Sequence, residues 1–194
     1  TLLPARLVVK VTDSRGQPYR GDLGFRRKTA GGSSVTPIPI KGEGSFEVSG
    51  VVPGSYAIVA GSSAGSPFER EKAGEYANLS FEVTDGDVEG LTVVTKPTVD
   101  LTVRVEFEPE PPSKLPNIGI VAQSLPDGEF YPQGPIEDDS TVLLKQVAGP
   151  VLLRLMPGDP KNAGWFLKGI FLGTRDITDT PVEFTPADAK LTAR

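Results

Sequence analysis

Residues 101–107 read LTVRVEF, an unbroken alternation of apolar and polar side chains. Because successive side chains of a strand point to opposite faces, this alternation predicts a strand with one buried and one exposed face. The same pattern recurs near the start of the chain, where Leu7, Val9 and Val11 mark the apolar face of residues 5–13. No window of ten residues keeps the helical spacing of apolar side chains, so the sequence predicts an all-β protein.

Further strands are predicted where short apolar runs stand between turn residues. They are residues 45–48, 55–60, 79–83, 91–95, 117–123, 141–146, 151–156 and 165–172. Turns with glycine separate several of them, such as Asp13–Gly16 and Pro53-Gly54. The best helical candidate is residues 69–77, which fit a short helical turn and an extended loop equally well. Many short strands at this spacing favour a β-sandwich.

The sequence contains an internal repeat with an offset of about 95 residues. The second half repeats a pattern of the first with one residue deleted. The first half carries Phe46, Val48, Val51, Gly54 and Tyr56, and the second carries Val142, Leu144, Val147, Gly149 and Val151. Further along, Asp87-Val88 is matched to Asp176-Ile177. The repeat predicts two Greek-key β-sandwich domains, residues 1–97 and 98–194, of which the second is the more divergent.

Charge limits the partners of this chain. It has 194 residues and a net charge of -5, and a mildly acidic surface argues against nucleic acid and against anionic membrane. The densest basic run, Arg26-Arg27-Lys28, is interpreted as a solvated strand end. No apolar run approaches the length of a membrane-spanning helix, so we expect no membrane insertion.

The chain contains neither histidine nor cysteine. Their absence from the sequence excludes nucleophiles paired with histidine, cysteine nucleophiles, thiolate metal sites and disulfides. A carboxylate pair for glycoside hydrolysis needs a defined separation across a cleft, and nothing in the sequence singles out such a pair. We therefore expect no enzymatic activity and no cofactor.

Two acidic runs are the candidate calcium sites. The first is Asp85, Asp87 and Glu89, and the second is Glu137, Asp138 and Asp139. The first run matches the opening half of a calcium-binding loop, but Lys96 stands where the bidentate glutamate belongs. Because calcium requires several converging oxygens, a solvated hairpin turn and an acidic edge loop are the favoured interpretations.

Three aromatic residues form the candidate platform for a ligand such as a sugar ring: Trp165, Tyr131 and Phe130. Tyr19 is a further aromatic residue at a loop or strand edge. Aromatic side chains prefer burial, so packing in the core or between domains is the favoured interpretation for Trp165.

Several segments resemble the carboxypeptidase regulatory-like domains, which belong with the prealbumin-like and Cna B-type modules. The segments are residues 11–18 (VTDSRGQP), 44–48 (GSFEV), 51–56 (VVPGSY) and 90–93 (GLTV). The resemblance covers residues 5–97 well and residues 98–186 more weakly, since Gly149-Pro150-Val151 replaces the Pro-Gly-Ser-Tyr segment. It implies a Greek-key sandwich of seven or eight strands.

Modules of this kind occur as strings in large secreted bacterial proteins. The resemblance therefore implies a non-catalytic structural or adhesive module at the cell surface, extracellular or periplasmic, and a piece of a longer protein. Its implied partners are neighbouring modules and a protein or glycan at the cell surface. Two alternatives stay open: a carbohydrate-binding module, and a filament subunit that self-assembles by strand addition.

Some Cna B-type modules carry an isopeptide bond between a lysine and an asparagine or aspartate. Lys10 lies in the first predicted strand and is the candidate lysine here. The alternation of residues 5–13 places Lys10 opposite Leu7, Val9 and Val11, on the side that faces water.

Overall fold

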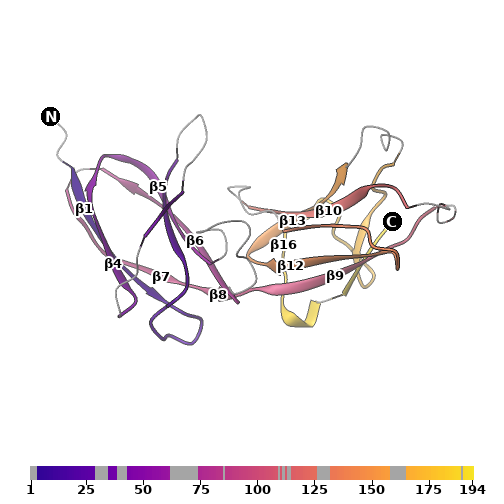
Figure 1. Ribbon diagram of the computed structural model, residues 1–194, viewed down its shortest axis with the longest axis horizontal. Coiled ribbons are helices and arrows are strands. Elements are labelled where there is room, and N and C mark those ends of the chain that lie inside the picture. Colours follow the sequence, from indigo (N-terminus) through magenta and orange to yellow (C-terminus); the bar gives the residue numbers. More distant parts are fainter. Residues whose placement is uncertain are drawn as a thin grey trace. The chain divides into compact units, whose positions relative to one another are not determined.

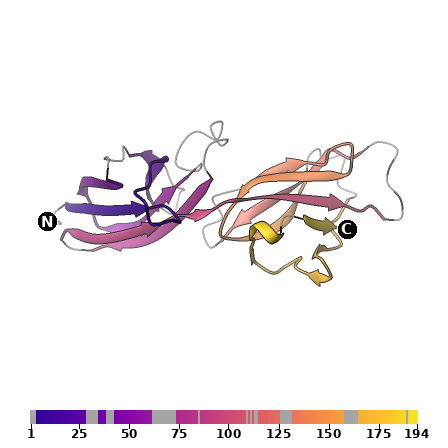
Figure 2. The same cartoon turned by 90° about the horizontal axis from the view of Figure 1, so that it is seen from below.

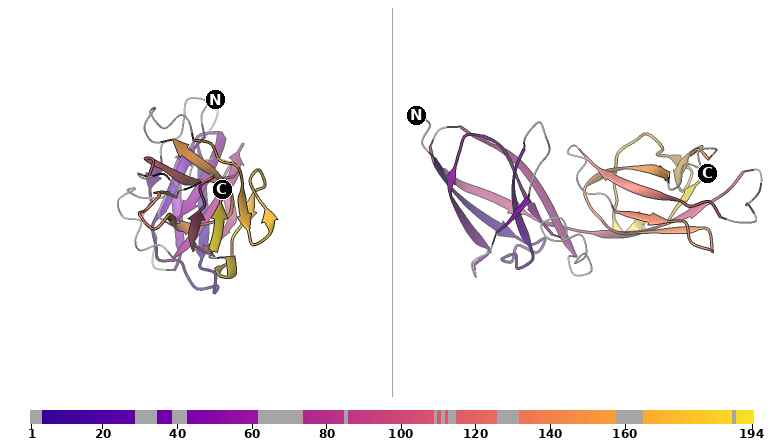
Figure 3. Two further views of the ribbon diagram at one scale, coloured as in Figure 1. Left: turned by 90° about the vertical axis from the view of Figure 1, so that its right-hand side faces the viewer. Right: turned by 45° about the horizontal axis from the view of Figure 1, so that its top comes forward.

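A computed structural model describes residues 4–28, 35–38, 43–61, 74–84, 86–108, 110, 112, 115–125, 132–157, 165–188 and 190–194. Regular structure in these residues is β, apart from one 3-10 turn at Pro186–Asp188, so the all-β prediction is confirmed. The chain divides into two compact units, Thr1–Pro97 and Thr98–Arg194. In each unit two sheets face each other (Figure 3).

The first unit places its strands in two sheets (Figure 1). Its strands are β1 Ala5–Thr12, β2 Leu23–Arg27, β3 Val35–Pro37, β4 Ser45–Val51, β5 Gly54–Ala60, β6 Glu75–Val83, β7 Val88–Val94 and β8 Lys96–Pro97. One sheet has the order β4-β1-β7 and the other the order β3-β2-β5-β6-β8. In the first sheet β1 pairs antiparallel with β4 and parallel with β7.

The second unit repeats this plan. Its strands are β9 Val99–Val105, β10 Ile118–Ser124, β11 Gln133–Pro135, β12 Thr141–Val147, β13 Pro150–Pro157, β14 Ile170–Leu172, β15 Arg175–Asp176, β16 Val182–Glu183 and β17 Lys190–Ala193. The sheet orders are β12-β9-β17-β14-β15 and β11-β10-β13-β16. Here β9 pairs antiparallel with β12 and parallel with β17, and Figure 2 shows β9 and β17 pointing the same way.

The repeat in the sequence corresponds to strand pairs of equal register. The pairs Leu7–Val48 and Val9–Phe46 of β1 and β4 match Leu101–Leu144 and Val103–Val142 of β9 and β12. The more distant match of Asp87-Val88 to Asp176-Ile177 is wrong. Val88 pairs with β1, whose counterpart β9 pairs with β17, whereas Asp176 lies in β15, which pairs with β14.

Alternation produces a separate apolar core in each unit. Leu7, Val9 and Val11 are buried in the first core, as the sequence predicts, and Leu101 and Val103 are buried in the second. Each such side chain stabilises the fold by about 1.5–3 kcal/mol relative to exposure. Lys10 is exposed, in agreement with its place on the opposite face.

Three predictions about local structure need correction. The strand expected over residues 165–172 is present only at Ile170–Leu172. The described part of residues 69–77 begins at Gly74 and enters strand β6, which excludes a helical turn at its end. The basic run is not fully solvated, because Arg26 lies within β2 and is only 5 % exposed.

The strands that were not predicted from the sequence are β2, β3, β8, β11, β15, β16 and β17. Each is short, and β2 combines a glycine with two arginines, a composition that gives no clear period-two pattern. Pairing with longer neighbours fixes them: β2 with β5, and β17 with β9. Among the described residues, no helix is long and apolar enough to cross a membrane.

Candidate functional site

Two residues of the first acidic run, Asp87 and Glu89, lie beside an arginine. The Arg6 amide donates to Asp87 Oδ1 at 2.7 Å, and the Arg6 guanidinium lies 2.6 Å from Glu47 Oε1 and 3.8 Å from Glu89 Oε1. The hydrogen bond to Glu47 is the main reason why the pKa of Arg6 is raised. Asp87 and Glu89 thus interact with a cation of the protein itself, and Asp85 lies outside the described residues.

The second acidic run forms the turn that leads into β12. Asp139 Oδ1 accepts hydrogen bonds from the Thr141 hydroxyl at 2.6 Å and the Thr141 amide at 3.1 Å, which lower the pKa of Asp139. The Ser140 amide donates to the Glu137 carbonyl at 2.9 Å and closes the turn. Glu137 and Asp138 are exposed. In the part of the chain that the structure describes, no three acidic side chains are grouped as metal ligands.

Of the three residues in the candidate aromatic platform, the structure describes only Trp165. Phe130 and Tyr131 lie outside the described residues, and Trp165 is half-buried at the edge of the second core. The Trp165 ring packs edge-on against Phe107, with 5.3 Å between ring centres and 78° between ring planes. The neighbouring Phe166 is 81 % exposed. Tyr19, the further candidate, is instead buried in the first core.

Trp165 lines a cavity of about 230 Å³ at one end of the second sandwich. Strands β9, β13 and β17 end there and β10 begins there, as their pairing registers require. The apolar wall includes Val105, Ile118, Ile120, Leu155, Trp165 and Ala193. This interior suits an apolar group, since it presents mainly hydrocarbon and aromatic surface.

Two ion pairs stand at the rim of this cavity. Arg194 Nε lies 2.8 Å from Glu106 Oε2, and Lys168 Nζ lies 2.5 Å from Glu108 Oε2. The hydrogen bond from Lys168 lowers the pKa of Glu108. All four side chains are about half-exposed, so these pairs arrange charge around the opening and contribute little to stability. The Arg194 guanidinium also lies over the Phe171 ring, 5.3 Å from its centre.

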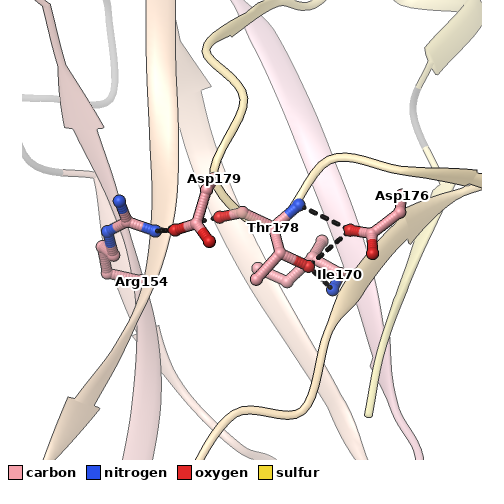
Figure 4. Close-up of polar contacts among 5 residues, drawn as sticks. All are labelled: Arg154, Ile170, Asp176, Thr178 and Asp179. Atoms are coloured by element: carbon pink, nitrogen blue, oxygen red, sulfur yellow. Dashed lines mark hydrogen bonds and ion pairs between the residues drawn. The ribbon is translucent and has the colours of Figure 1, made fainter.

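A polar cluster on the same unit fixes the segment after β15 against β13 (Figure 4). Arg154 Nη1 donates to the Thr178 carbonyl at 2.9 Å and to Asp179 Oδ1 at 2.8 Å. The Thr178 hydroxyl donates to Asp176 Oδ1 at 2.5 Å and accepts from the Ile170 amide at 3.0 Å. The hydrogen bonds from the Thr178 hydroxyl and amide lower the pKa of Asp176 and hold a turn.

The cluster shares a local motif with the acidic turn. In Asp139-Ser140-Thr141 and Asp176-Ile177-Thr178, the threonine amide and hydroxyl both donate to the aspartate two residues earlier. The spacing Asp-x-Thr is visible in the sequence and is typical of such turns. The spacing is not specific for turns, because Asp100-Leu101-Thr102 shows it within strand β9.

A second polar centre lies in the first unit. Glu75 Oε2 accepts hydrogen bonds from the Thr95 hydroxyl at 2.5 Å and the Ser14 amide at 3.1 Å, and Glu75 Oε1 accepts one from the Ser14 hydroxyl. The Thr95 amide donates to the Thr12 carbonyl at 2.9 Å. Glu75 therefore ties the turn after β1 to the segment that leaves β7. Sequence reasoning missed it, because these residues are far apart in the chain.

No protein-family model matches the chain, and no curated protein matches it. Among solved structures, the minor pilin of Streptococcus agalactiae is 12% identical over 97% of this chain and 93% of its own, with a TM-score of 0.40. A streptococcal ancillary pilin is 11% identical over 99% of this chain and 63% of its own, with a TM-score of 0.36.

The Bacillus anthracis TIE protein is 13% identical over 94% of this chain, with a TM-score of 0.36. The chain spans 31% of the TIE structure and 63% of the ancillary pilin structure. Similarity at these identities and TM-scores establishes neither a family nor a shared activity. The chain is established as an all-β protein of two sandwich units by its own strand pairing.

Proposed function

We propose that the chain is a non-catalytic structural module of a cell-surface protein and that it bears tension along the chain. One observation carries the proposal. In the first unit β1 pairs in parallel with β7, and in the second unit β9 pairs in parallel with β17. Because the paired strands run in the same direction, the chain enters each sandwich at one end and leaves it at the other.

This geometry determines how force acts on the hydrogen bonds. Tension on the two ends of the first unit pulls β1 and β7 in opposite directions along their own axes. The ladder from Leu7–Val88 to Thr12–Val94 is then loaded in shear, so several hydrogen bonds must break together. An unzipping hairpin breaks its bonds one after another and yields at lower force.

Backbone hydrogen bonds extend both ladders beyond the strands. The Thr95 amide donates to the Thr12 carbonyl at 2.9 Å, and the Glu106 amide donates to the Ala193 carbonyl at 2.7 Å. Glu75 further holds Thr95 in place through its side chain. The resemblance of residues 11–18 and 51–56 to modules strung along secreted proteins supports the same role and the surface location.

Force spectroscopy with two pulling directions tests the proposal. The chain contains no cysteine, so pairs of introduced cysteines define the attachment points. Pro4→Cys with Val94→Cys loads the β1–β7 ladder in shear, whereas Pro4→Cys with Glu89→Cys pulls it open from one end. We expect a several-fold higher unfolding force for the first pair. Equal, low forces in both directions would contradict a tension-bearing role.

A proline in the ladder provides a second readout. Thr95→Pro, just after β7, removes the amide that donates to the Thr12 carbonyl and so shortens the first ladder. When the two ends of the whole chain are pulled, so that both units bear the load, we expect the force peak of the first unit to fall while that of the second stays unchanged. The second unit therefore serves as the control within the same molecule.

A further inference from the structure

In the first sandwich, the end that corresponds to the cavity of the second sandwich is closed by a tyrosine ring. Tyr19 is 5 % exposed and belongs to the first core, and its amide donates to the Val11 carbonyl at 3.1 Å. Val11, Leu23 and Ala60 form this end and are all buried. In the first unit, an aromatic ring therefore fills this position of the fold.

Strand pairing identifies the same positions in the second unit. Leu23 faces Ala60 across β2 and β5, as Ile120 faces Leu155 across β10 and β13. Val11 faces Val93 across β1 and β7, as Val105 faces Ala193 across β9 and β17. In the second unit Val105 and Leu155 are partly exposed and line the cavity of about 230 Å³.

We propose that this cavity receives an aromatic ring from a second copy of this chain, that of Phe166. Phe166 is one of the residues that line the cavity, and it exposes 81 % of its surface, more than any other large hydrophobic residue that the structure describes. A two-fold axis near the mouth places each Phe166 opposite the cavity of the other copy. The interface is then self-complementary, and the proposal is independent of the tension-bearing role.

The charges at the rim fit a second copy. The rim carries two cations, Lys168 and Arg194, and two anions, Glu106 and Glu108, so its net charge is zero. Because these charges are paired within the chain and sum to zero, a second copy of the same patch meets no net charge repulsion there. The apolar wall favours a hydrocarbon ring over a sugar, which requires several polar partners inside its site.

Sedimentation equilibrium and fluorescence test the proposal on the whole chain. The weight-average mass is expected to rise from 20.6 kDa towards twice that value as concentration increases from micromolar to millimolar. Trp165 is the only tryptophan and lines the cavity, so its emission is expected to shift to shorter wavelength over the same range.

Phe166→Ser is the decisive variant. Because Phe166 is exposed, its loss leaves the fold intact, and we expect dimerisation to weaken by at least about tenfold. Val94→Ser is the matched control: it removes an exposed apolar side chain, 57 % exposed, from the first unit and is expected to dimerise like the wild type. Far-UV circular dichroism verifies the fold of both variants.

Competition with a small aromatic molecule tests whether the ring of the second copy binds in this cavity. p-Cresol carries the phenol ring of a tyrosine side chain, and it is expected to shift Trp165 emission and to dissociate the dimer. A chain that stays monomeric throughout overturns the proposal, as does a Phe166→Ser variant that dimerises like the wild type. Dimerisation that leaves Trp165 emission unchanged also overturns it, because the ring then binds elsewhere.

Discussion

At the scale of the residue, Tyr19 shows how one side chain changes its properties with its surroundings. The ring is buried among Val11, Leu23 and other apolar residues of the first core, and the hydroxyl donates a long hydrogen bond of 3.4 Å to the Asp22 carbonyl. Burial, followed by the nearby charge of Asp22, raises the pKa of Tyr19 to about 12 from its ordinary value of 10.0.

This shift predicts a loss of stability in alkali. Above about pH 10 the phenol ionises in the unfolded chain but stays protonated in the folded one, so the unfolded state binds fewer protons. The free energy of unfolding therefore falls by about 1.4 kcal/mol per pH unit until the folded Tyr19 ionises near pH 12. Below pH 10 this contribution is constant.

Tyr19→Phe removes that part of the pH dependence. Urea unfolding of the wild type and the variant, followed by circular dichroism at pH values from about 9 to 11, measures the difference. The difference cancels the titration of the remaining tyrosines and lysines. If the free energy of unfolding falls with pH as steeply in the variant as in the wild type, Tyr19 ionises with an ordinary pKa in the folded state.

The burial of Tyr19 was beyond sequence reasoning for a physical reason. Its neighbours in the chain, Pro18 and Arg20, give no periodic pattern, and it follows a turn. The pairing of β1 with β7 and of β2 with β5 creates the space that it fills. Leu7 and Val9 were predicted correctly, because alternation within one strand is a local property.

At the scale of the element, strands β4 and β12 carry equivalent β-bulges, so the repeat extends to the conformation of the backbone. The register of β4 against β1 shifts beside Ala5, where Gly50 has a φ of 79°. The register of β12 against β9 shifts at the equivalent place, where Gln146 has a φ of 58°. A left-handed conformation suits glycine and is unfavourable for glutamine.

The two bulges predict opposite effects of substitution. Gly50→Ala is expected to lower the free energy of unfolding of the first unit by about 1 kcal/mol, through backbone strain alone. The added methyl group meets no atom within 4 Å. Gln146→Gly is expected to raise the free energy of unfolding of the second unit by up to about 1 kcal/mol, partly offset by the entropy of glycine.

Urea unfolding measures both effects, by circular dichroism for the first and Trp165 fluorescence for the second. The backbone hydrogen bond from the Gln146 amide to Asp100 Oδ1 is retained in the glycine variant, so it does not confound the comparison. Destabilisation by both substitutions would mean that the two bulges are not equivalent.

Elements were predictable to the extent that their patterns are local. The bulge could not be located from sequence, because Lys145-Gln146 and Ser49-Gly50 have no common side-chain pattern. The expected strand over residues 165–172 failed for a related reason. Lys168 and Gly169 still bond to the Arg194 backbone beside β14. Trp165 and Leu167, however, pack on the second core from residues outside the paired strands, and apolar spacing alone did not distinguish them from a strand.

At the scale of the whole molecule, the repeat was predictable but the difference between its copies was not. The matched apolar positions of β4 and β12 are visible in the sequence and lie in strand pairs of equal register. The closed end of the first unit depends on Tyr19, and the cavity at the equivalent end of the second unit is lined by Trp165. These positions have no counterparts in the repeat, so only the spatial arrangement distinguishes the ends.

The division into two compact units predicts two separable unfolding transitions. Leu7 and Leu101 occupy equivalent, fully buried positions in β1 and β9. Replacing either by alanine leaves a cavity and is expected to cost about 2–5 kcal/mol in the unit that contains it. Trp165 reports the second unit alone, whereas circular dichroism reports both.

Leu101→Ala is therefore expected to lower the urea midpoint seen by Trp165 fluorescence, and Leu7→Ala to leave that midpoint in place. In circular dichroism, each variant should shift about half of the total signal change to lower urea concentration, because that half comes from the mutated unit. The pair is matched in chemistry, burial and strand position, so only the unit differs. If Leu7→Ala shifts the fluorescence midpoint as far as Leu101→Ala does, the two sandwiches unfold as one cooperative unit, and the boundary at Pro97 separates them in contacts but not in stability.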